Sequence, residues 1–199
     1  ARLVQMAVRV AESSGGTVAA VFRVPAERQA AYDLLSNPRM DWDMVGDASY
    51  IATVRRAIGE EFVFVPEDGS SLNITDEAHT KGTGPVGARS LGARGFQVMN
   101  LIVVDRKGVP LGLCGQAWWA RTETAVTKSN KSRSTEEKET KYWGIEMAAA
   151  RELFMKHAPG TKPWFQLDRG GGREPMGHDS VVLRSPVVGR RRRVTMLPA

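Results

Sequence analysis

The sequence predicts an α/β protein in which helices flank a mixed sheet, with a small helical region before the sheet. In the first third of the chain, apolar residues recur at helical spacing. From residue 62 onward, short runs rich in aromatic and β-branched residues predict strands, and one long amphipathic pattern predicts a helix between them. This order is typical of a mixed sheet with helices packed on it. We therefore expect one domain over residues 1–59 and a second over residues 60–199.

Three short helices are expected in the first domain. The second helix begins at Pro25, because proline is tolerated in the first turn. The third begins after Asp47, whose carboxylate can accept from first-turn amides, and ends at Gly59. The apolar stripes are Leu3, Met6, Ala7 and Val10, then Ala31, Leu34 and Leu35, then Ile51, Val54 and Ile58. Such narrow stripes predict a small helical layer.

The second domain opens with a predicted strand at Phe62–Val65. This continuous apolar run is typical of a strand covered on both faces, and Pro66–Gly69 predicts its end. Gly95–Val104 and Leu111–Ala120 flank the turn sequence Asp105–Gly108, which predicts a hairpin.

The strongest helix prediction covers Glu136–His157. Trp143, Met147, Ala150 and Phe154 fall on one of its faces. Short strands are predicted at Trp164–Leu167 and Val181–Leu183, and the basic segment Arg121–Thr135 is expected to be an exposed loop.

Composition excludes several classes of protein. The chain has 199 residues, 42% of them hydrophobic and 25% charged, which is too apolar for a disordered chain. No apolar run reaches the roughly 18–20 residues that a membrane helix needs, so no membrane partner is expected. Cys114 is the single cysteine, which rules out an internal disulfide and fits a reducing compartment. We therefore expect a cytoplasmic protein.

The excess of basic residues favours a polyanionic partner. Lys and Arg number 28 against 22 Asp and Glu, a formal net charge of +6. Basic residues gather at Lys128–Arg133 and at Arg190–Arg193. Two interpretations stay open, a solvated loop and tail or contacts with DNA phosphates.

Two aspartates directly follow predicted strands. Asp68 comes after the first strand of the second domain, and Asp168 follows Trp164–Leu167. Strands that end at one edge of a sheet can bring such carboxylates together, and paired carboxylates suit Mg²⁺ or Mn²⁺ in a two-metal arrangement. The simpler interpretation stays open, because an aspartate before a glycine is a common turn residue.

Several motifs in a fixed order resemble those of bacterial insertion-sequence transposases of the DDE class. Their order along the chain is Glu67–Leu72 (EDGSSL), the glycine-rich Gly82–Gly87, Gly112–Arg121 (GLCGQAWWAR), Glu137–Trp143 (EKETKYW), Asp168–Gly170 (DRG) and Val182–Ser185 (VLRS). Ala31–Pro38 is similar to part of that family's small DNA-binding domain. The resemblance therefore covers almost the whole chain.

The resemblance implies an RNase H-like catalytic domain after a helical DNA-binding domain. Asp68 and Asp168 would be the first two catalytic, metal-binding residues, with Mg²⁺ or Mn²⁺ as cofactor and the double-stranded DNA of transposon ends as substrate. Arg184 would contact DNA, and Arg190 and Arg191 add basic charge for the same purpose. A second copy of the chain, or a full-length transposase, would be the protein partner.

One departure from the family pattern is important for activity. The family's third catalytic residue is a glutamate in a Tyr-Arg-Glu type helix, and no such segment occurs in this sequence. We therefore expect a truncated transposase with little or no strand cleavage by the chain alone. The alternative is a non-catalytic DNA-binding remnant or decoy that acts on transposon ends or on a full-length partner.

Overall fold

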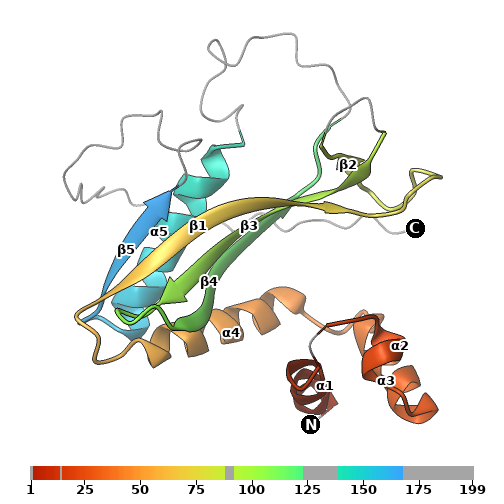
Figure 1. Cartoon of the computed structure of the whole chain (residues 1–199), viewed down its shortest axis with the longest axis horizontal. Coiled ribbons are helices and arrows are strands. Elements are labelled where there is room, and N and C mark those ends of the chain that lie inside the picture. The colour runs from red at the N-terminus through yellow and green to blue at the C-terminus, as the bar shows by residue number, and fades with distance from the viewer. Residues whose placement is uncertain (1, 14, 88–91, 123–138, 168–199) are drawn as a thin grey trace. The chain divides into compact units, whose positions relative to one another are not determined.

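The computed structural model describes residues 2–13, 15–87, 92–122 and 139–167. The chain divides into two compact units, Ala1–Asp47 and Ala48–Ala199, which are considered separately below. Figure 1 shows the elements in chain order. The expectation of a mixed α/β fold is confirmed, because an open mixed sheet is combined with several helices.

The first unit is helical. It contains α1 (Arg2–Ala11), α2 (Val18–Val21) and α3 (Pro25–Leu35). The Thr17 hydroxyl accepts from the amide of Ala20 at 3.3 Å, which starts α2, and Pro25 opens α3 as expected. Phe22, Ala31 and Leu34 form its buried apolar residues.

Helix α4 (Trp42–Arg56) begins earlier than the sequence suggested. The carboxylate of Asp41 accepts from the amide of Met44 at 3.1 Å, so Asp41 holds the first turn and Asp47 lies inside the helix. Both aspartates can cap a helix in principle. The predicted start after Asp47 was therefore wrong by about one and a half turns.

The sheet of the second unit has five strands. They are β1 (Phe62–Asn73), β2 (Gly84–Pro85), β3 (Arg94–Val104), β4 (Pro110–Trp119) and β5 (Lys162–Leu167). β3 pairs antiparallel with β1 along one edge and with β2 and β4 along the other. β5 pairs parallel with β1. The predicted hairpin of β3 and β4 and the predicted strand at β5 are both confirmed.

β1 corrects the prediction that the first strand ends at Pro66–Gly69. The strand continues through this turn-like sequence to Asn73, because β3 is long enough to pair with it as far as Gly95. Pro66 has no N–H to donate, and the pairing with β3 is interrupted between Phe64 and Glu67. Pairing with a distant strand thus overrides the local turn preference.

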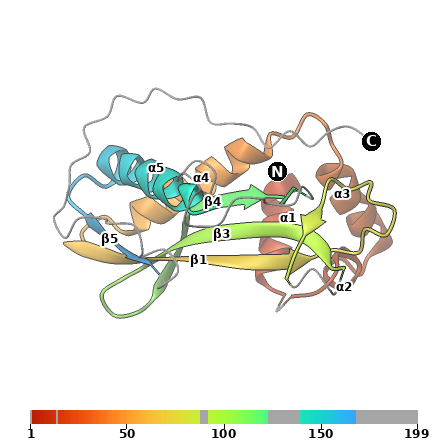
Figure 2. The same cartoon turned by 90° about the horizontal axis from the view of Figure 1, so that it is seen from above.

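The helices cover one face of the sheet, which we call the helix face. α5 (Lys141–His157) packs against β4, β3 and β5, and Figure 2 shows it to one side of the sheet. The core that it buries also takes in the end of α4 and consists of Val54, Ala57, Val63, Val65, Met99, Leu101, Val103, Cys114, Ala150, Phe154 and Ala158. The start of α5 is fixed to the end of β4, because Glu139 accepts from Trp119 at 3.0 Å and twice from Arg121 at 2.7 Å.

The opposite side of the sheet, the outer face, carries a different set of side chains. In β1, burial alternates, so that Val63 and Val65 face the helices while Phe62 and Phe64 lie on the outer face. The two phenylalanines contact Trp164 of β5, whose side chain is 61% exposed. The expectation that this strand is covered on both faces was therefore wrong for the described part of the chain.

Some predicted elements lie outside the described residues. These are the strand at Val181–Leu183, most of the loop at Arg121–Thr135 and the first residues of the helix predicted from Glu136.

Candidate functional site

Asp68 lies in β1 on the outer face of the sheet. Side chains alternate along a strand, so Glu67 points to the helix face and Asp68 to the opposite side. Asp68 is exposed and pairs with Asn100 of β3 in the antiparallel register. Within the described part of the chain, no side chain forms a hydrogen bond or ion pair with its carboxylate. The carboxylate is therefore available to a ligand.

The parallel pairing of β1 with β5 has a constant register. Each residue from Phe62 to Glu67 pairs with the residue one hundred positions later, so Glu67 lies beside Leu167. Asp68 and Asp168 are the next residues along the two chain segments. Asp168 lies outside the described residues, as do Arg184, Arg190 and Arg191.

Polar side chains cross the outer face beside Asp68 in a single row. Asn100 lies opposite Asp68 on one side and opposite Gln116 of β4 on the other. The amide nitrogen of Gln116 donates to Oδ1 of Asn100 at 2.6 Å, and the indole nitrogen of Trp118 donates to Oε1 of Gln116 at 2.7 Å. Three side chains from two strands thus form a continuous hydrogen-bonded chain that ends next to Asp68.

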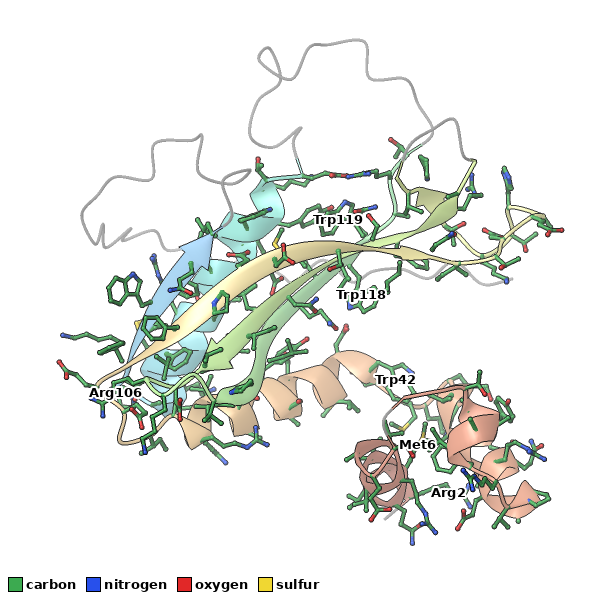
Figure 3. The ribbon with its side chains drawn as sticks, viewed as in Figure 1. Arg2, Met6, Trp42, Arg106, Trp118 and Trp119 are labelled. Atoms are coloured by element: carbon green, nitrogen blue, oxygen red, sulfur yellow. The ribbon has the colours of Figure 1, made fainter. Side chains whose placement is uncertain are left out.

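The two adjacent tryptophans of β4 have separate roles. Figure 3 shows their indoles on opposite sides of the strand. Trp119 stacks on Tyr142 of α5 with ring centroids 4.4 Å apart, whereas Trp118 lies on the outer face and is 39% exposed. Trp119 therefore belongs to the packing of the helix face, and Trp118 to the polar row.

Glu67 places a second carboxyl directly behind Asp68. Its side chain is 2% exposed, and neither carboxyl oxygen has a hydrogen-bond partner in the described structure. Burial, with a smaller contribution from the negative charge of Glu146, raises the pKa of Glu67 to about 8. Glu67 is therefore largely protonated at neutral pH, so it adds little negative charge behind Asp68.

A buried aspartate organises the loop that follows β1. The carboxylate of Asp76 accepts from the Thr83 hydroxyl and from the backbone amides of Thr80 and Lys81, and Arg94 lies 4.0 Å away. These hydrogen bonds, above all that from Thr83, hold the pKa of Asp76 below its usual range. The glycine-rich segment Gly82–Gly87 thus continues a loop that is tied to β3 through Arg94.

Sequence reasoning did not select Asn100, Gln116, Glu67 or Asp76. Two of these could have been found, because Asn100 and Gln116 are polar residues inside otherwise apolar strands and belong to adjacent strands of a predicted hairpin. Glu67 and Asp76 gave no comparable signal, since acidic residues beside prolines, glycines and threonines are common in turns.

The described residues contain no cluster of three or more histidine, cysteine, aspartate or glutamate side chains with metal-binding geometry. Within the strands that the structure describes, Asp68 is the one acidic side chain on the outer face. Among these same residues, no helix has the length and apolar character needed to cross a membrane. Neither a model of a known protein family nor a curated protein matches the chain.

Proposed function

We propose that the chain is a DNA transposase of the DDE class, with an RNase H-like catalytic domain after a small helical DNA-binding domain. The sheet supports the proposal: antiparallel strands β1, β3 and β4 come first, then α5, then β5 parallel to β1. The sequence motifs that resemble those of DDE transposases occur along the chain in the same order as these elements. Asp68 stands in the central part of the sheet, on the face opposite α5.

The parallel register between β1 and β5 carries the proposal. Glu67 and Leu167 are direct neighbours, and one more residue along each segment leads to Asp68 and Asp168. Consecutive Cα atoms are 3.8 Å apart, and paired strands are about 4.8 Å apart. The residues that directly precede the two aspartates are therefore neighbours in the sheet, despite a separation of one hundred residues in sequence.

The chemistry of this site suits a hard divalent cation. Asp68 offers an exposed carboxylate without a competing partner in the described residues, and the paired position on β3 holds the neutral amide of Asn100. Mg²⁺ prefers oxygen ligands and keeps several waters. Asp68 and Asp168 would hold the metal, which when bound would activate water and stabilise the leaving oxygen of a phosphodiester.

Double-stranded DNA at transposon ends is the substrate that we propose. The net charge of +6 favours a polyanion, and Arg184, Arg190 and Arg191 are the residues proposed for phosphate contacts. The helical unit that precedes the sheet would add to the contact with DNA.

A titration of the full chain with Mn²⁺, followed by the electron paramagnetic resonance signal of the free ion, tests the proposal. We expect binding that weakens at least tenfold in Asp68→Asn and in Asp168→Asn, as expected for loss of a metal ligand. Asp105→Asn, in the turn between β3 and β4, is the matched control and should bind Mn²⁺ as the wild type does. Equal binding by the wild type and both site variants would overturn the metal-dependent function.

A second candidate function is a DNA-binding remnant or decoy without catalysis. This candidate applies if Asp168 does not join Asp68 in binding metal, because two metal ions need more negative charge than one carboxylate provides. Duplex binding that weakens steeply with salt is expected under both candidates. Salt-sensitive DNA binding without aspartate-dependent Mn²⁺ binding would select the remnant.

A further inference from the structure

The polar row on the outer face has a defined direction. An indole N–H can only donate, so Trp118 requires Gln116 to present its oxygen. Gln116 must then direct its amide nitrogen at Asn100, which accepts through Oδ1. The amide nitrogen of Asn100 is then left for an acceptor other than Gln116.

The chain of hydrogen bonds ends opposite Asp68. Asn100 and Asp68 are direct partners in the pairing of β1 and β3, and side chains at such positions have Cβ atoms about 4.5–5.5 Å apart. Within the described residues, Nδ2 of Asn100 has no acceptor and the Asp68 carboxylate has no donor. One unused donor and one unused acceptor therefore lie at paired positions of neighbouring strands, and no hydrogen bond joins them in this structure.

We propose that Asn100 is a positioning residue for Asp68, and that Gln116 and Trp118 set the orientation of its amide. This inference rests on the proposed metal-binding role of Asp68. When a metal binds, the amide of Asn100 would turn to donate to one oxygen of the Asp68 carboxylate and would leave the other oxygen for the metal. Trp118 is the fixed end of this arrangement, because its donor cannot be reversed.

The proposal follows a general property of metal sites. Carboxylates that bind metals are usually held by hydrogen bonds from neighbouring groups, and loss of these groups weakens metal affinity about 10–100-fold. An asparagine side chain suits this purpose because it brings a donor without adding charge. A reversed amide would instead present Oδ1 to the carboxylate, which would repel it.

Two substitutions test the hydrogen-bonded polar row, one at Asn100 and one at Gln116. Asn100→Leu removes the donor with little change in size, and Gln116→Glu keeps the acceptor for Trp118 but removes the donor to Asn100. With Gln116→Glu, Asn100 would turn its nitrogen toward the new carboxylate and its oxygen toward Asp68. We expect each variant to bind Mn²⁺ about tenfold more weakly than the wild-type chain does.

The double variant separates positioning from general damage. If Gln116 acts only through Asn100, Gln116→Glu has no further effect in the Asn100→Leu background. Gln166→Glu is the matched control, because it adds the same charge to the outer face on β5 and has no contact with the row. It should not weaken Mn²⁺ binding. The circular dichroism spectrum and the thermal unfolding midpoint of every variant should stay close to those of the wild type, which verifies folding.

The outcomes distinguish this inference from the proposed function. If Asp68→Asn loses Mn²⁺ while Asn100→Leu and Gln116→Glu bind as the wild type does, the positioning role is wrong and the metal site stands. If Gln116→Glu weakens Mn²⁺ binding equally in the wild-type and in the Asn100→Leu background, then Gln116 does not act through Asn100 and this part of the proposal is wrong. If Asp68→Asn binds Mn²⁺ normally, both proposals are wrong.

Discussion

Glu146 of α5 raises the pKa of Glu67 across the interface between the helix and the sheet, in addition to the larger effect of burial. Glycine at position 115 leaves the necessary room, because a Cβ atom there would lie 2.9 Å from Oε2 of Glu146. Position 115 pairs with Leu101, which in turn pairs with Glu67. The carboxyl group of Glu67 on β1 and that of Glu146 on α5 thus lie in the same region of the helix face.

The raised pKa of Glu67 predicts that stability falls as pH rises. The folded carboxyl, with a pKa of about 8, keeps its proton where the unfolded one, near 4.5, has lost it. The contribution is therefore fully present below pH 4.5 and is lost progressively up to pH 8, by about 2–4 kcal/mol. Urea unfolding at pH 5, 6.5 and 8 should show this fall in the wild type and not in Glu67→Gln. The exposed Glu61→Gln serves as control and should retain the wild-type fall.

Gly112 is predicted to be intolerant of alanine. Its φ of 134° lies in a region that side chains rarely adopt, and a Cβ atom would lie 2.5 Å from Oγ1 of Thr53 on α4. Gly112→Ala should lower the free energy of unfolding by about 2–4 kcal/mol through strain and overlap. Gly144→Ala, on α5 with open space around it, should raise it by about 0.5–1 kcal/mol. Chemical denaturation of both variants checks the contrast, and equal stability of the two would contradict it.

Cys114 is predicted to be unreactive in the folded protein. Burial raises the pKa of its thiol to about 12, so almost no thiolate exists at pH 8. A thiol reagent such as Ellman's reagent should react slowly with the native chain and rapidly after unfolding in urea. Because Cys114 is the single cysteine, the signal is unambiguous. Fast reaction of the native protein would show that this part of the core opens readily.

Strand cleavage by the chain alone is predicted to be weak. The sequence resemblance to DDE transposases suggests counterparts for two of their three catalytic carboxylates, Asp68 and Asp168, and two carboxylates hold a pair of metal ions poorly. Nicking of supercoiled plasmid with Mg²⁺ or Mn²⁺ should stay close to the level of Asp68→Ala and Asp168→Ala. Robust cleavage that both substitutions abolish would show that the third glutamate is not needed.

Local patterns were sufficient to predict much of the fold. The hairpin of β3 and β4 was predicted because two apolar runs flank Asp105–Gly108, and the structure places a turn there in which Asp105 accepts from the amides of Lys107 and Val109. Most of α5 was predicted because its apolar stripe repeats over several turns. In both cases the information lies within a few residues of the element itself.

The extent of β1 and the polar row could not be obtained in this way. Pro66–Gly69 has the composition of a turn, and only pairing with β3 and β5 keeps it extended. The alignment of Asn100 with Asp68 depends on the register of two strands, which sequence patterns do not specify to one residue. The pairing of Asp68 with Asp168 stays a prediction, although the register of the strands that lead to them supports it.

The hundred-residue separation between β1 and β5 has a consequence for synthesis on the ribosome. β1, β3 and β4 are translated long before Lys162, so the edge of β1 that pairs with β5 stays unpaired during this interval. An unpaired edge can join another chain, which makes this interval the most exposed to aggregation. It also means that a nascent chain carries only the first of the two aspartates proposed to bind a metal until Asp168 has been translated.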